Sequence, residues 1–275
     1  MYSIAVCFYG FTRNALNVPD LELFFRQFFG TEPLDIAIYY ATYSASTEFD
    51  APDTRVDVGV VETALRRNNA NVRTVRVSTK PYSETECLRH VKGAGAKRVF
   101  NSLAKVFLHR EYSMYTCMKR CVDLIEQPVD FVCVSRTDWG INQITTPRKV
   151  NIVEYLNDRP GVVAGHLNGS ITKNHKLLST DPRFMFGRRA DMSFVSELPT
   201  LFLRHIGDVK DPNSVMHVHA FVSYILKRRL AINIISHNIM FGVMKNLPDR
   251  VCANRSLNSS LEQRRRLQEV FDRLT

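Results

Sequence analysis

The chain has 275 residues, of which 45% are apolar, and a formal net charge of +10. This length and composition exclude an intrinsically disordered chain, and they allow one large domain, or two closely packed halves, with a substantial core. The charge favours an anionic partner, such as nucleic acid, a phosphate-bearing small molecule or an anionic surface. The basic residues are scattered in short groups, however, a pattern that is typical of solvated helix faces.

The first 80 residues predict a strand-helix succession. Apolar residues follow a helical stripe in the first predicted helix, which Gly30 closes. Such alternation is the signature of an α/β fold with a parallel sheet wound by helices. The predicted strands cover residues 3–10, 34–40 and 71–78, and the predicted helices cover residues 20–29 and 57–68.

The loop after the first strand is the first candidate for ligand binding. Gly10 lets backbone amides approach a ligand, and Arg13 can grip a phosphate with its planar guanidinium. An ordinary turn between a strand and a helix is the alternative. At the end of the second strand, Tyr39, Tyr40 and Tyr43 can stack on a base or plug the edge of a sheet.

The second candidate follows the predicted central strand. A long helical stretch over residues 97–127 leads to Phe131–Val134, an apolar, β-branched run that predicts a strand buried on both faces. Ligands in open α/β sheets collect just past the carboxyl ends of the strands. We therefore interpret Asp138 as a metal-binding or ligand-binding carboxylate and Arg136 as its charge partner. A structural Arg–Asp pair that caps the strand is the alternative.

The C-terminal half is less regular. Asp181 precedes a predicted strand in a loop, as a catalytic carboxylate would need to, although Asp-Pro is also a common turn opener. His217 and His219 point to different helix faces, so one of them can bind a metal, or both are packed histidines. Helices are predicted over residues 150–156, 190–206, 213–229 and 261–274, and strands over residues 161–165, 183–187 and 230–236.

The cysteines and the hydropathy indicate a cellular setting. Cys7 and Cys133 lie in predicted strands and are expected in the core. Cys117 and Cys121 are one helical turn apart, but no second Cys or His pair completes a zinc site. Reduced thiols, no N-terminal signal peptide and no bilayer-spanning apolar run lead us to expect a cytoplasmic protein without a membrane span.

Several short motifs, in their order along the chain, carry a resemblance. They are Ile4-Ala5-Val6 with Gly10 and Arg13-Asn14, then Leu34–Ile38, Asn101-Ser102, Met114-Tyr115, Val129-Asp130-Phe131 leading to Arg136-Thr137-Asp138, Asp181–Gly187 and His217-Val218-His219. Together they span residues 3 to 235. This succession resembles GT-A-type glycosyltransferase-like proteins of bacteria and large DNA viruses. The usual Asp-x-Asp motif is Arg136-Thr137-Asp138 here, and His219 stands where a Glu is usual.

The resemblance implies a GT-A-like fold: one continuous domain with a nucleotide-sugar-binding half over residues 1–140 and an acceptor-binding half over residues 141–275. It implies transfer of a sugar from a nucleotide-diphosphate donor, most often a UDP-sugar, to a hydroxyl of a glycan or glycoprotein. If the protein is viral, the host cytoplasm is the expected location. The implied donor-binding residues are Tyr9, Gly10, Arg13, Tyr40, Arg136 and Asp138.

The implied chemistry fits the residue types. A carboxylate-held Mn²⁺ or Mg²⁺ offsets the charge of the leaving diphosphate, and the implied ligands are Asp138, His217 and His219. An inverting transfer needs a base for the acceptor hydroxyl, and Asp181 is the candidate; in a retaining transfer Asp181 would only orient the substrate. Two alternatives stay open: a nucleic-acid-binding or processing protein, for which no recognised motif is present, and a catalytically inactive glycosyltransferase-like scaffold.

Overall fold

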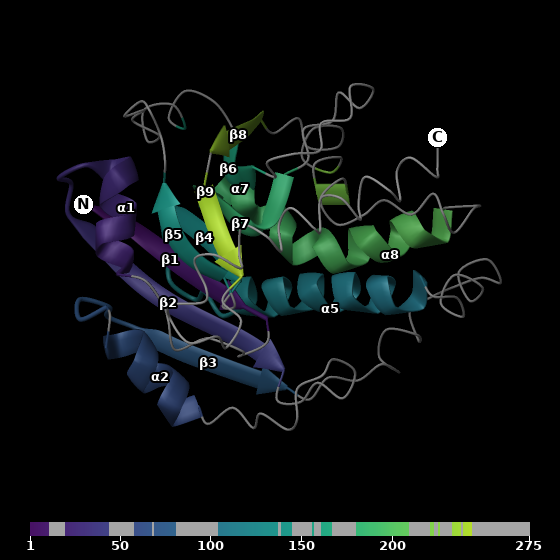
Figure 1. The fold of residues 1–275 in the computed structure, drawn as a ribbon, viewed down its shortest axis with the longest axis horizontal. Helices are drawn as coiled ribbons and strands as arrows, with labels where there is room; N and C mark the ends of the chain where they lie inside the picture. The colour runs from purple at the N-terminus through teal and green to yellow at the C-terminus, as the bar shows by residue number, and fades with distance from the viewer. Residues whose placement is uncertain are drawn as a thin grey trace.

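The computed structural model describes residues 1–10, 20–43, 58–67, 69–80, 104–136, 139–144, 156, 161–166, 180–208, 221–222, 225, 233–237 and 239–243. Within these ranges the strands are β1 (Tyr2–Tyr9), β2 (Leu34–Tyr43), β3 (Val75–Lys80), β4 (Phe131–Arg136), β5 (Trp139–Ile144), β6 (Gly161–His166), β7 (Thr180–Arg188), β8 (Asn233–His237) and β9 (Ile239–Val243). The helices are α1 (Leu21–Phe29), α2 (Val58–Arg67), α5 (Ala104–Asp123), α7 (Arg189–Met192) and α8 (Leu198–Asp208), with a 3-10 helix η2 over Ser193–Glu197. The fold is shown in Figure 1.

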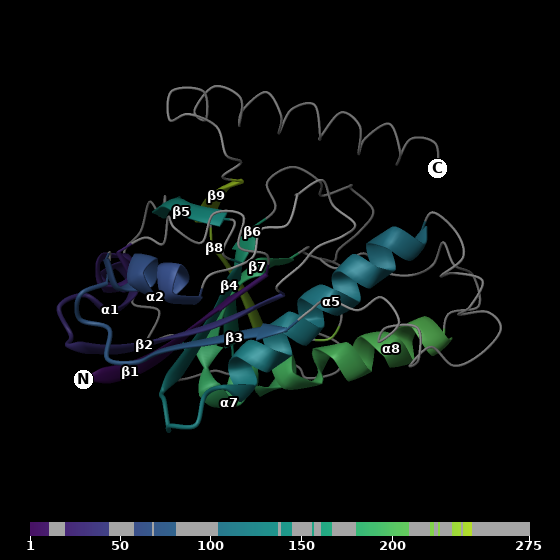
Figure 2. The ribbon, with the colours of Figure 1, turned by 90° about the horizontal axis from the view of Figure 1, so that it is seen from below.

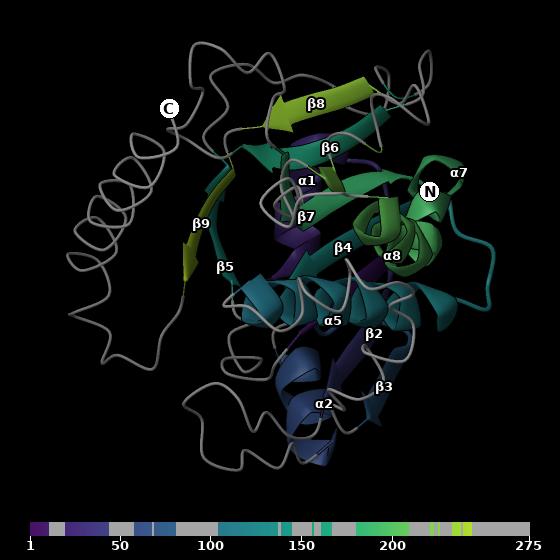
Figure 3. The ribbon, with the colours of Figure 1, turned by 90° about the vertical axis from the view of Figure 1, so that its right-hand side faces the viewer.

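The main sheet of the described residues has seven strands in the order β3-β2-β1-β4-β7-β6-β8, and β5 pairs with β9 in a separate ribbon. Parallel pairing joins β1 to β2 and β4, β2 to β3, and β6 to β8. The strand β7 is antiparallel to both of its neighbours. The expectation of a mixed α/β fold with a mainly parallel sheet is therefore confirmed. Figure 3 shows the sheet with α5 in front of it and the ribbon to one side.

Helices cover both faces of the sheet, so its central strands are buried on both sides. Successive side chains of a strand point to opposite faces of the sheet. In β1 the side chains on both faces are apolar. Ile4, Val6 and Phe8 belong to the core under α1 and α2, whereas Cys7 and Tyr9 belong to the core under α5 and α8. Figure 2 shows these two helical layers on either side of the strands.

The helix α1 packs an aromatic face against the middle of the sheet. Its stripe places Phe25 with its ring centroid 5.5 Å from that of Phe186 in β7, and Phe29 5.2 Å from Phe131 in β4. The helix ends at Gly30, whose φ of +64° suits glycine at a helix C-terminus. The predicted helix and its closing glycine are therefore confirmed.

The structure also differs from the predicted elements. The sequence did not predict β5 and β9, because each is a short strand of a two-stranded ribbon in which polar and apolar residues do not alternate clearly. The helix predicted over residues 190–206 is divided into α7, η2 and α8. Pro199 lacks the amide that would continue an uninterrupted helix, but it fits the first turn of α8.

None of the described helices is long and apolar enough to cross a membrane. The helix predicted over residues 261–274 lies outside the described residues, and of the helices predicted over 150–156 and 213–229 only residues 156, 221, 222 and 225 are described.

Candidate ligand site at the carboxyl edge of the sheet

The strand order reverses at β1, and this reversal defines the candidate site. The chain proceeds from β1 outward through β2 to β3, then returns to form β4 on the other side of β1. Ligands of open α/β sheets bind at such a switch point, outside the carboxyl ends of the strands. Tyr9, the last residue of β1, lies in register with Arg136, the last residue of β4. We call the edge at which β1, β2, β3, β4, β6 and β8 end the carboxyl edge.

Gly10 forms the turn that leaves β1 at this edge. Its φ is +110°, a conformation that side chains other than glycine rarely adopt, and a Cβ built there would have no neighbour within 4 Å. The requirement for glycine is thus one of backbone conformation. Its amide donates to the Ala41 carbonyl of β2 over 3.2 Å. The Gly10 amide is therefore already used within the protein.

Tyr9 and Tyr40 lie inside the protein. Both side chains are fully buried, Tyr9 in the core beneath α5 and Tyr40 in the core beneath α1 and α2. The alternation of a strand that is buried on both faces explains this position. The expectation that Tyr40 offers its ring to a base therefore needs correction, because in this structure both tyrosines support the strand ends from within the core.

Arg136 lies at the switch point, as its place at the end of an apolar run indicated. It is partly exposed, directly after Ser135, which is fully buried. The ribbon strand β5 begins only three residues later, at Trp139. Asp138 itself lies outside the described residues, as do Arg13, His217 and His219. The predicted pairing of Arg136 with Asp138 therefore stays a prediction.

Asp181 is not in a loop, contrary to the sequence-based expectation. It is the second residue of β7, and its backbone is in register with Gly165 of β6. Asp-Pro is a common turn opener, but here the strand continues through both residues: Asp181 pairs with Gly165, and the register with β6 shifts between this pair and the Met185–Ala164 pair. Because β7 is antiparallel to β4, its beginning lies at the carboxyl edge. Asp181 thus remains on the same edge as Arg136.

Two histidines at this edge received no role from the sequence. His166 ends β6 in register with Thr180, and His237 ends β8 in register with Gly165. Gly165 therefore lies between Asp181 on one neighbouring strand and His237 on the other. The available signal was a histidine one residue beyond a short apolar run, Val162–Ala164 before His166 and Ile234–Ile235 before His237.

A second group missed by sequence reasoning lies on α5. Glu111 and Tyr115 are one helical turn apart, and both are buried. Burial is the main cause that raises the pKa of Tyr115 well above its ordinary value, and the neighbouring Glu111 and Tyr9 raise it further. The Tyr115 hydroxyl has no hydrogen-bond partner within the described ranges. Tyr9, which raises the pKa of Tyr115, is the last residue of β1, so Tyr115 lies close to the carboxyl edge.

Among the residues that the structure describes, no three or more His, Cys, Asp or Glu side chains form a group that could hold a metal ion. No protein-family model and no curated protein sequence matches the chain.

Proposed function

We propose that the chain is a glycosyltransferase with a GT-A-like fold that transfers a sugar from a nucleotide-diphosphate donor, with UDP as the nucleotide, to a hydroxyl of a glycan or glycoprotein. The observation that carries the proposal is the meeting of Tyr9–Gly10 and Arg136 at the switch point of a mainly parallel sheet. A fold alone does not define a reaction. The motifs at this edge, which resemble those of glycosyltransferase-like proteins, supply the rest of the argument.

The donor diphosphate would bind beside Arg136 and Arg13. A guanidinium offers two parallel donors to phosphate oxygens, and its charge persists at any physiological pH. The turn at Gly10 ends β1 at this edge, and the proposal places the phosphates beside the residues that follow it. Tyr9 and Tyr40 would hold this surface in place from the core rather than contact the nucleotide.

The proposed metal ion is Mn²⁺ or Mg²⁺, bound by the Asp138 carboxylate. Such an ion would act as a Lewis acid on the leaving diphosphate. Histidine ligands would favour Mn²⁺, because Mg²⁺ is bound almost entirely through oxygen. His217 and His219 remain candidate ligands, and His166 and His237, whose strands end at the carboxyl edge, join them.

Asp181 is the proposed base if the transfer inverts the anomeric centre. Its carboxylate would accept the proton of the acceptor hydroxyl while that oxygen attacks the sugar. Its place at the start of β7 is compatible with this role, because a group on a strand is held more firmly than one on a loop. In a retaining transfer, Asp181 would orient the substrate instead.

The described basic residues give little support to the nucleic-acid alternative. Four arginines, in α1, in α2, in β3 and just before β3, each lie beside a carboxylate. These ion pairs are Arg26–Glu22, Arg66–Glu62, Arg73–Asp35 and Arg76–Glu126. A surface that binds nucleic acid needs cations that are available to phosphates.

A thermal-shift screen tests the proposal. The intact chain is heated with UDP-, GDP- and CMP-linked sugars, with and without Mn²⁺, and with generic DNA and RNA at two salt concentrations. A ligand at 100 times its Kd stabilises the folded state by about 2.7 kcal/mol, which raises the Tm of a domain of this size by roughly 5–10 °C. We expect this shift with one nucleotide sugar and Mn²⁺.

The matched variants are Asp138→Asn and Asp123→Asn. Asp123 is an exposed carboxylate at the end of α5 away from the carboxyl edge, where it pairs with Lys119. We expect Asp138→Asn to abolish the shift and Asp123→Asn to preserve it. A shift without sugar transfer in a product assay would indicate an inactive scaffold. No shift with any nucleotide sugar would contradict the proposal, and a salt-sensitive shift with DNA or RNA would replace it.

A further inference from the structure

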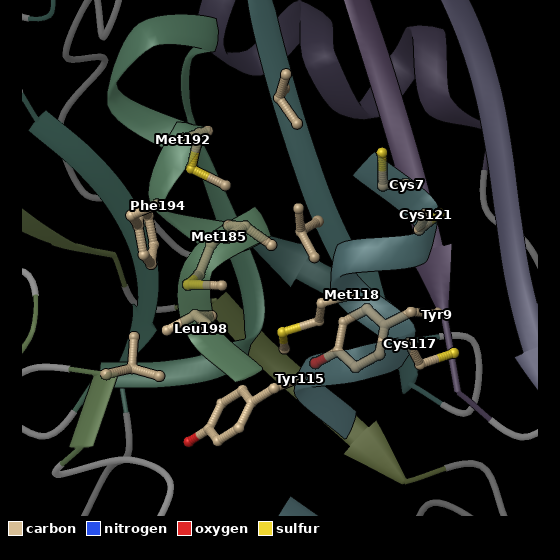
Figure 4. Close-up of a cluster of buried hydrophobic side chains, with 14 of the residues drawn as sticks. Cys7, Tyr9, Tyr115, Cys117, Met118, Cys121, Met185, Met192, Phe194 and Leu198 are labelled. Carbon is tan, nitrogen blue, oxygen red and sulfur yellow. The ribbon is translucent and has the colours of Figure 1, made fainter. Parts of the chain in front are cut away.

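Two thiols on α5 donate hydrogen bonds to the backbone of the two strands beneath the helix. Cys117 Sγ lies 2.9 Å from the carbonyl oxygen of Ala41 in β2, and Cys121 Sγ lies 3.2 Å from that of Phe8 in β1. The cysteines are one helical turn apart, so they lie on the same side of the helix. Figure 4 shows both against β1, with Cys7 beside Cys121 and Tyr9 beside Cys117.

The two acceptors differ in their relation to the candidate site. The Ala41 carbonyl also accepts the Gly10 amide over 3.2 Å, so a thiol and an amide converge on the same oxygen. Phe8 lies within β1, before the turn. Cys117 thus donates to the carbonyl that accepts the Gly10 amide, and the Gly10 backbone also interacts with its sulfur. Cys121 donates to a carbonyl within β1, and its second backbone contact is with Ala41 rather than with Gly10.

Cys117 acts as a neutral donor rather than as a nucleophile. Its side chain is buried, and burial is the main cause that raises the pKa of the thiol to about 12. A thiol with this pKa keeps its proton at physiological pH, and reactive cysteines have lowered pKa values and partial exposure. The hydrogen bond to Ala41 therefore persists over the range in which the protein works.

We infer that Cys117 is a positioning residue of the candidate site: its thiol fixes the Ala41 carbonyl and, through it, the turn at Gly10 that leaves β1 at the carboxyl edge. This inference rests on the proposed function for its effect on nucleotide binding. A loop held in its bound conformation loses less freedom when a ligand binds. Loss of the thiol donor should therefore weaken donor binding without a change in the chemical step.

The experiment compares the two thiols of α5 as a matched pair. Cys117→Val and Cys121→Val keep a similar volume but remove the donor, and Cys117→Ser and Cys121→Ser keep a donor. Amide hydrogen exchange is measured at Gly10, relative to Val132 in β4 as an internal reference for global opening. Nucleotide-sugar affinity is measured by calorimetry, and kcat and KM by product assay.

We expect Cys117→Val to speed exchange at Gly10 at least 10-fold relative to Val132 and to raise Kd and KM 3- to 10-fold at constant kcat. Cys117→Ser should recover most of both effects. Cys121→Val should leave the relative exchange rate at Gly10 and the Kd within twofold of the parent values, even if it lowers the Tm as much as Cys117→Val does. If a valine variant does not fold, the Cys117→Ala and Cys121→Ala pair takes its place.

Equal effects of the two thiols on Gly10, or no effect of Cys117, would overturn the inference. The proposed function fails separately, when the parent chain binds no nucleotide sugar. In that case the exchange at Gly10 still decides whether Cys117 holds the turn, because that measurement needs no ligand.

Discussion

Ser3 and Asp130 join the starts of β1 and β4 at the edge opposite the candidate site. The Asp130 carboxylate accepts the Ser3 amide over 2.8 Å and the Ser3 hydroxyl over 2.7 Å. These bonds favour the charged form, the amide bond most, and they lower the pKa of Asp130 below its ordinary value. A single carboxylate thus links the first strand to the central strand, although the two residues are far apart in the sequence.

This pair predicts a pH-dependent contribution to stability. Because the pKa of Asp130 is lower in the folded than in the unfolded state, the contribution is present above the unfolded pKa of about 3.9 and is lost as the pH falls through the folded pKa. We expect Asp130→Asn to lower the free energy of unfolding at pH 7 by less than about 1 kcal/mol, since the pair is exposed. Urea titrations between pH 7 and pH 3 measure the difference, which should shrink below about pH 4.

The control is Ser3→Ala, which removes the hydroxyl donor but keeps the amide. Its stability difference from the parent should also shrink toward low pH, and the double variant should cost less than the sum of the two single variants. A difference that stays constant down to pH 3 would show that the charge of Asp130 makes no contribution.

At the scale of an element, α1 shows how a sequence pattern becomes packing. Its phenylalanines recur at helical spacing and meet aromatic rings from β4 and β7, so that Phe28 stacks on Phe186 with centroids 5.8 Å apart and planes 20° apart. Aromatic pairs of this kind add to the stabilisation from buried area. The opposite side of the helix carries Arg26, which pairs with Glu22 in solvent.

This contrast predicts very different effects of neighbouring substitutions. Phe25 is fully buried among Phe24, Phe28, Phe29 and Phe186, so Phe25→Ala should lower the free energy of unfolding by about 3–5 kcal/mol. Arg26→Ala breaks only the exposed pair with Glu22 and should cost below about 0.5 kcal/mol. Chemical denaturation followed by far-UV circular dichroism measures both. A cost of Phe25→Ala near that of Arg26→Ala would mean that α1 does not pack on the sheet as described.

At the scale of the whole molecule, the main sheet passes through the boundary that the sequence placed near residue 140. The strand β4 from the first half pairs with β7 from the second, with Val132 opposite Gly187. A Cβ at Gly187 would meet the Gly161 carbonyl oxygen at 3.0 Å, so the close approach of β6 favours glycine there. The halves therefore share one sheet and one pair of core clusters.

We expect the described parts of both halves to unfold together because of this shared sheet. Trp139, the only tryptophan of the chain, begins β5 next to the candidate site. Its fluorescence and far-UV circular dichroism should give coincident denaturation curves, which is the usual test of two-state behaviour. Phe186→Ala, at the junction of the halves, should move both curves by the same amount. Two separate transitions would indicate that the halves are independent.

The sequence by itself determined much of the first half. Helical stripes predicted α1 and α2, and short apolar runs predicted β1, β2, β3 and β4. These patterns lie within each element, because a helix buries one stripe of its surface and a central strand buries both of its faces. The same local reasoning placed Gly10 and Arg136 at strand ends. It also assigned Cys7 and Cys133 to the core, where both are buried.

The tertiary structure alone decided which residues meet. Tyr40 and Asp181 were assigned by their neighbours in sequence, but burial of the second face hides Tyr40, and pairing with β6 draws Asp181 into a strand. The register of distant strands brings Arg136 beside Tyr9 and puts His166 and His237 on the same edge. Strand order and register arise from long-range packing and backbone pairing, which short sequence patterns do not encode.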